Sequence, residues 1–118
     1  MKKTEMLKKN YEYKRVLTKG KYYSGKYIEA FIKTNNNNKK NFLGIAIGVK
    51  IAKAVKRNHI KRLIRENYKS LEEKINSGNT VVFLWKKKID IKNANYKNIK
   101  QDMEDIFNKS KLFIEEKK

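Results

Sequence analysis

An amphipathic segment between two apolar segments constrains the fold of this 118-residue chain more than any other feature. Residues 52–75 place apolar side chains at helical spacing, which predicts one long helix. Residues 41–49 (NFLGIAIGV) alternate large and small apolar side chains, and residues 80–85 (TVVFLW) form the continuous apolar run of a buried strand. Because a helix can connect two parallel strands, we expect a βαβ unit within a mixed sheet.

The other segments add helices and strands around this unit. Asn10 can cap a helix that ends at Gly20, and residues 21–34 alternate as extended structure before a polar loop at 35–40. We expect Gly78 to be a left-handed cap that ends the long helix, and residues 94–109 to form a last helix. Since no linker or repeat divides the chain, residues 1–118 are predicted to form one domain.

One face of the predicted strand at 41–49 carries only small residues, namely Gly44, Ala46 and Gly48. Small side chains let another backbone or a ligand approach closely, and they also make room for a packed helix. The sequence leaves both interpretations open.

The net charge of the chain limits the classes of partner that it is expected to bind. Lys and Arg number 31 against 12 Asp and Glu, a net charge of +19. This charge opposes folding unless a polyanion neutralises it, so nucleic acid or an anionic membrane is the expected partner. The chain has no cysteine and a single histidine, His59, which excludes a disulfide framework and leaves little for metal ligation. With neither a membrane span nor a secretory signal in the sequence, we expect a cytoplasmic protein.

On a helical wheel the long helix has two faces. The apolar face collects Ile60, Leu63, Ile64, Tyr68 and Leu71, whereas the cationic face collects Lys53, Arg57, Asn58, Lys61, Arg62 and Arg65. Arg57, Lys61 and Arg65 repeat like charge at i,i+4 spacing, which destabilises a helix by a few tenths of a kcal/mol per pair.

A bound polyanion would relieve this repulsion, and the guanidinium group of arginine can form two parallel hydrogen bonds with one phosphate. A nucleic-acid surface is therefore favoured over an incidental solvated face and over a membrane-surface helix, which would need Trp or Phe anchors. No helix-turn-helix spacing precedes the helix, which favours a folded RNA over duplex DNA.

The same residues resemble a known family. KAVKRNHIKRLIRENY (53–68) is similar to the signature of the bacterial ribonuclease P protein subunit, in which an Arg-Asn pair is followed by a Lys-Arg pair and another Arg on one helix. Residues 7–20, 44–55 and 78–87 resemble the N-terminal segment of that family, the strand that leads into its basic helix, and its next strand. The resemblance covers nearly the whole chain in the right order.

This resemblance implies an α+β fold of order αβββαβα, with a mixed four-stranded sheet packed by helices. It also implies a left-handed βαβ crossover, where the general rule gives a right-handed one. The function implied is that of the protein subunit of ribonuclease P, a tRNA 5′-processing endoribonuclease. Its catalytic centre lies in the partner RNA and uses Mg²⁺ held mainly by that RNA. The implied partners are ribonuclease P RNA and precursor tRNA, with no membrane and no small-molecule cofactor.

The resemblance also assigns site residues, none of them catalytic and none a metal ligand. Residues predicted to bind the catalytic RNA are Lys53, Lys56, Arg57, Asn58, His59, Lys61, Arg62 and Arg65. Residues predicted to bind the single-stranded 5′ leader of the substrate are Tyr13, Leu17, Phe31 and Lys50. His59 stands where the family commonly has Arg, and Leu17 stands where an aromatic residue is usual. Tyr13 and Phe31 fit a core position as well as a leader-binding cleft.

The last helix carries a cluster of acidic residues that could suggest a nuclease. Asp102, Glu104 and Asp105 on the last helix are interpreted as a solvated face rather than a nuclease centre. The competing functional hypothesis is a ribosomal-type protein or general RNA chaperone without a dedicated enzyme. Such a protein needs positive charge but not this order of motifs.

Overall fold

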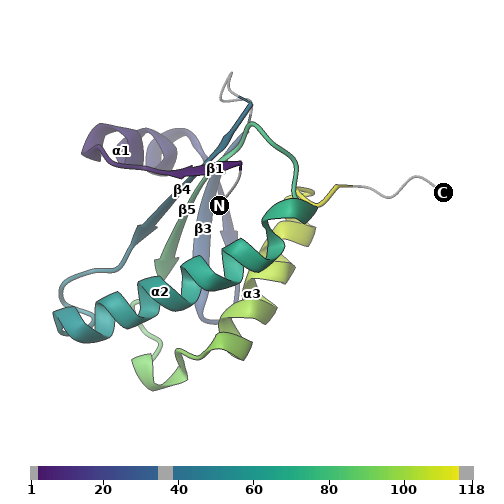
Figure 1. The fold of residues 1–118 in the computed structure, drawn as a ribbon. Coiled ribbons are helices and arrows are strands. Elements are labelled where there is room, and N and C mark those ends of the chain that lie inside the picture. Colours follow the sequence, from purple (N-terminus) through teal and green to yellow (C-terminus); the bar gives the residue numbers. More distant parts are fainter. Residues whose placement is uncertain (1–2, 35–38, 115–118) are drawn as a thin grey trace.

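A five-stranded sheet with helices on both faces forms the framework of the molecule (Figure 1). The structure is a computed structural model that describes residues 3–34 and 39–114, so most of the predicted polar loop lies outside the described residues. In chain order the elements are β1 (Thr4–Met6), α1 (Asn10–Lys19), β2 (Lys21–Ser24), β3 (Ile28–Lys33), β4 (Asn41–Ala46), α2 (Ala54–Leu71), the 3-10 turn η1 (Glu72–Lys74), β5 (Thr80–Trp85), the 3-10 turn η2 (Ile91–Asn93) and α3 (Tyr96–Lys109).

The sheet is mixed, as predicted. Its order is β1-β4-β5-β3-β2, with β1, β4 and β5 parallel and with β3 and β2 antiparallel to their neighbours. The predicted count of four strands is wrong by one, because β1 adds a parallel edge strand beside Asn41–Leu43. Thr4 of this strand is buried, and its hydroxyl lies 2.8 Å from the hydroxyl of Tyr68 on α2. Burial raises the pKa of Tyr68 to about 12, so this pair stays protonated.

The predicted βαβ unit is present, since α2 connects the parallel strands β4 and β5. In Figure 1 both strands run downward, α2 lies nearer the viewer, and the chain moves from β4 on the left to β5 on its right. This arrangement is a left-handed crossover. The helix ends at Leu71 and continues only as η1, and Gly78 has φ 86° in the turn before β5 rather than at the helix end.

The main core lies between the sheet and the helices α2 and α3. Ile28, Ala30 and Ile32 of β3 point into it, as the alternation of that strand predicts. On α3 the buried apolar residues are Ile99, Met103, Ile106 and Phe107. Tyr96, at the start of the helix beside the Asn95 cap, is 41% exposed.

On the opposite face of the sheet, α1 packs over the small residues of β4. A Cβ atom at Gly44 would lie 2.6 Å from Cε1 of Tyr13, so the helix needs glycine there. A Cβ at Gly48 would meet only Ile51, at 3.6 Å, and requires no such approach. The packed-helix interpretation is therefore correct at Gly44. The expected Asn10 cap is wrong by one residue, because Lys9 is the N-cap and its N–H donates to Glu12 Oε1 at 3.2 Å.

Asp102 is not part of a solvated face, and that interpretation is wrong for this residue. It is 5% exposed, and its carboxylate accepts hydrogen bonds from the backbone N–H groups of Lys26, Tyr27 and Ile28 at 2.9, 2.6 and 2.9 Å. The carboxylate thus closes the turn between β2 and β3 onto α3. Asp105, in contrast, is exposed and pairs with Lys109 at 2.8 Å.

Candidate RNA interface

The helix α2 has the two faces that its sequence predicts. Ile60, Ile64, Tyr68 and Leu71 are buried against the sheet and α3. On the other side, the cationic face of α2 consists of the exposed residues Lys53, Asn58, Arg62 and Arg65 together with the half-buried Arg57 and Lys61. The other two predicted RNA-binding residues, Lys56 and His59, are exposed on the side of the helix that faces η2. The packing of the apolar side fixes the helix, so these polar side chains all project from a rigid element.

Hydrogen bonds order part of this cationic face. Arg57 donates from Nη1 to the carbonyl oxygen of Ala52 at 2.8 Å, which leaves the rest of its guanidinium for a ligand. Arg62 forms an i,i+4 ion pair with Glu66 at 3.0 Å. Arg65 makes no hydrogen bond or ion pair within the described part of the chain. The face therefore presents two guanidinium groups with free donors, those of Arg57 and Arg65, two helical turns apart. Each can form paired hydrogen bonds with phosphate oxygens.

His59 lies at the edge of this face rather than in its middle. With Lys56, Asp90 and Lys92 it lines a hollow of about 280 Å³ between α2 and η2. His59, one of the two residues that depart from the family pattern, is therefore exposed and lies near two lysines and one aspartate.

The second predicted surface lies on the sheet face that α1 partly covers. Tyr13 and Phe31 lie in one apolar cluster with Leu7, Val16 and Val82, so the structure brings these two predicted residues together. Leu17 is 36% exposed on α1, outside that cluster. The Phe31 ring also lies 5.2 Å, centroid to centroid, from that of Tyr22.

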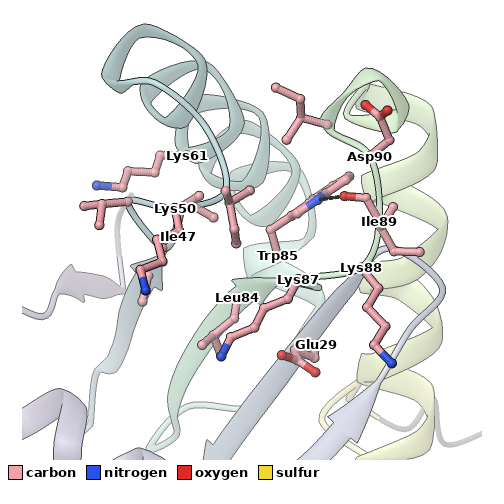
Figure 2. A pocket seen from close by; sticks show the side chains of 15 residues that line it. Glu29, Ile47, Lys50, Lys61, Leu84, Trp85, Lys87, Lys88, Ile89 and Asp90 are labelled. Atoms are coloured by element: carbon pink, nitrogen blue, oxygen red, sulfur yellow. Dashed lines mark hydrogen bonds between the residues drawn. The ribbon is translucent and has the colours of Figure 1, made fainter.

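Lys50 is not part of that aromatic cluster. It lines a larger hollow of about 1020 Å³ at the carboxyl ends of β4 and β5, with Lys61 of α2 and with Lys87 and Lys88 after β5 (Figure 2). The Trp85 indole forms one wall and donates to the carbonyl oxygen of Ile89 at 2.8 Å.

This lysine-lined hollow connects the two predicted surfaces. Ala46, Leu84 and Glu29, which pair across the sheet, also line it. They pair one row along the same sheet face from Gly44, Val82 and Phe31, and Lys61 of α2 lies at the rim of the same hollow. A polyanion could therefore pass from the cationic face of α2 to the aromatic sheet surface over lysine side chains.

Sequence reasoning missed Tyr22, Lys87 and Lys88. Residues 21–24 read only as extended structure, and nothing local shows that Tyr22 pairs with Phe31. The two lysines directly follow the buried strand β5, and their position at its carboxyl end was the signal that could have identified them.

Two other features bear on the chemistry. Within residues 3–34 and 39–114, no group of three or more His, Cys, Asp or Glu side chains is placed to hold a metal ion. No helix in these ranges is long and apolar enough to cross a membrane.

A basic α+β domain that combines an arginine-rich helix, a lysine-lined hollow and an aromatic sheet surface is an RNA-binding domain by its chemistry. The family model for ribonuclease P matches residues 1–111. Ribonuclease P protein components from Clostridioides difficile (strain 630) and Clostridium novyi (strain NT) are 30% and 32% identical, covering 95% and 96% of this chain and 96% and 99% of theirs. The chain belongs to the ribonuclease P protein family, and its function is that of the protein subunit of this tRNA 5′-processing enzyme.

Solved structures agree on the fold. A Staphylococcus aureus RNase P protein superposes with a TM-score of 0.80 at 27% identity, covering 92% of this chain and 97% of that chain. The Thermotoga maritima RNase P protein, at 22% identity, superposes with a TM-score of 0.78 over 95% of this chain and 99% of that chain. The mixed sheet packed by helices is thus the fold of bacterial RNase P proteins.

Proposed function

We propose that this protein docks on ribonuclease P RNA through the cationic face of α2 and holds the 5′ leader of precursor tRNA on the α1 side of the sheet. The observation that carries the proposal is the cationic face itself, whose like charges lie on a helix fixed by a buried apolar side. The protein would act in the cytoplasm, without a membrane partner or small-molecule cofactor.

In this role the protein binds and orients but does not cut. Arginine and lysine side chains of α2 neutralise phosphates of the catalytic RNA and release counterions. Tyr13 and Phe31 offer ring faces to unpaired leader bases, and Lys50 offers charge to the leader backbone. The Mg²⁺ of the holoenzyme would be held mainly by the RNA, where it would supply charge stabilisation at the scissile phosphate.

Reconstitution tests this role directly. Adding the folded protein to a bacterial ribonuclease P RNA should lower the Mg²⁺ concentration needed for half-maximal cleavage of precursor tRNA, because protein cations replace part of the ionic screening. The measurement is cleavage rate against Mg²⁺ concentration with and without saturating protein. An unchanged Mg²⁺ requirement with folded protein would contradict the proposal. An unrelated basic protein of similar charge is the control for screening alone.

Leader binding predicts a selective effect at Tyr13. Tyr13→Ala should reduce the preference for precursor over mature tRNA about 5- to 150-fold, the value of one stacked base. Tyr13→Phe keeps the ring that fills the space over Gly44 and should retain the preference. The dissociation constants of the two tRNAs from the holoenzyme are the measurement. An equal loss for both tRNAs would assign Tyr13 to the core alone.

A further inference from the structure

An exposed tyrosine extends the aromatic surface of the sheet beyond the predicted residues. Tyr22 on the edge strand β2 pairs directly with Phe31 on β3, and their ring planes are tilted by 55° at a centroid distance of 5.2 Å. Tyr22 is 48% exposed, so much of its ring faces solvent beside Phe31. A ring that served only the core would be covered.

A carboxylate fixes the position of this ring. The Tyr22 hydroxyl donates to Oε2 of Glu29 at 2.6 Å, a short charge-assisted bond, and this bond raises the pKa of Tyr22. Glu29 also lines the lysine-lined hollow, so an acidic group stands within a basic surface. An acid there opposes phosphate binding, and its bond to Tyr22 gives a physical reason for its presence.

The position of Tyr22 relative to the other groups identifies its ligand. Tyr22, Phe31 and Val82 lie in one row of the sheet, on the face that carries Tyr13, and Glu29 lies in the next row toward Lys50 and Lys87. Aromatic rings in a line beside lysines are the arrangement that binds single-stranded nucleic acid, in which bases stack and phosphates meet cations. Paired RNA offers no free base face to such a ring.

We propose that Tyr22 stacks against an unpaired base of the precursor-tRNA leader, next to the base held by Phe31, and that Glu29 is a positioning residue that fixes the Tyr22 ring. This inference rests on the proposed leader-binding function and adds a contact to it.

The test uses the reconstituted holoenzyme and precursor tRNAs whose leaders are shortened one nucleotide at a time. Tyr22→Ala should weaken binding of long-leader precursor about 5- to 150-fold and leave mature tRNA unchanged. The loss should disappear below a threshold leader length, when the chain no longer reaches Tyr22. Tyr96→Ala, which removes a similarly exposed tyrosine from α3 on the other face of the sheet, is the matched control and should change neither substrate.

A second pair of variants tests the positioning role. Glu29→Gln and Glu29→Ala remove the same charge, but only glutamine keeps an oxygen that accepts from Tyr22. We expect Glu29→Gln to bind long-leader precursor at least threefold more tightly than Glu29→Ala. Tyr22→Phe, which keeps the ring, should retain most of the affinity that Tyr22→Ala loses. Thermal unfolding of each variant confirms that it is folded.

The outcomes separate this inference from the function on which it rests. If Tyr13→Ala reduces the preference for precursor and Tyr22→Ala does not, the Tyr22 contact is wrong while leader binding stands. If neither substitution changes the preference for precursor over mature tRNA, leader binding on this face is itself wrong. Equal binding by Glu29→Gln and Glu29→Ala would overturn the positioning role.

Discussion

Replacing Arg57 and Arg65 together by alanine should weaken binding to ribonuclease P RNA by at least about 150-fold. Each arginine is expected to make one charge-assisted contact with phosphate, worth about 1.5–3 kcal/mol. Each lost phosphate contact should also lower the slope of log affinity against log salt by about one. Arg65 is exposed without an internal ion pair among the described residues, and Arg57 keeps free donors beyond its bond to Ala52.

The matched control removes the same charge from a different face. Lys97→Ala with Lys100→Ala takes two exposed lysines from α3, so the net charge falls equally. Filter binding or fluorescence anisotropy at several salt concentrations measures both slopes. Equal losses in the two double variants would mean that overall charge, rather than the cationic face of α2, drives binding. Because Arg57 bonds to Ala52 at the start of α2, thermal unfolding of the variant must show that the helix is retained.

Asp102→Ala should destabilise the protein by about 3–5 kcal/mol, a large part of the 5–15 kcal/mol that holds an ordinary domain together. The substitution leaves three backbone N–H groups, those of Lys26, Tyr27 and Ile28, without their acceptor in a closed turn. A Cβ at Gly25 would lie 2.7 Å from Cγ of Asp102, which shows how tightly the turn is packed on the carboxylate. The midpoint of thermal unfolding should fall by about 15 °C.

Urea unfolding of Asp102→Ala and Asp105→Ala gives the comparison. Asp105 lies on the same helix in an exposed i,i+4 pair with Lys109, so its loss should change the free energy of unfolding by less than about 0.5 kcal/mol. Similar free energies for the two variants would show that the turn does not depend on Asp102. Asp102→Asn keeps one acceptor oxygen and should fall between them.

The parts of the fold that were predictable are those whose signal is periodic and long. The apolar face of α2 and the alternation of β3 each follow from side-chain spacing, and the parallel pairing of β4 with β5 follows from the helix between them. β1 was missed because Thr4–Met6 is three residues long, too short for alternation to be visible. Asp102 was misjudged because its partners lie 74 to 76 residues away in sequence, where no local pattern reports them.

The residues of the candidate site also differ in how far the sequence predicts their positions. Residues on α2 share one face because the helical repeat places them there. Sites assembled from several strands depend on the register of the sheet. Only the folded sheet therefore shows that Tyr22 lies beside Phe31, and that Lys50 lies apart from Tyr13.

The helices α1 and α2 lie on opposite faces of one sheet, so under the proposed docking the sheet would set the distance between the leader and the catalytic RNA (Figure 1). Two helix–sheet layers of about 10 Å each separate the two helices, roughly 20 Å in all. In the proposed complex the catalytic RNA lies on the α2 side and the leader on the α1 side, so the thickness of the protein would set the distance between them. The close packing of both helices on the sheet fixes this separation, so under the proposed docking the leader would enter at a constant offset from the catalytic RNA whatever its sequence.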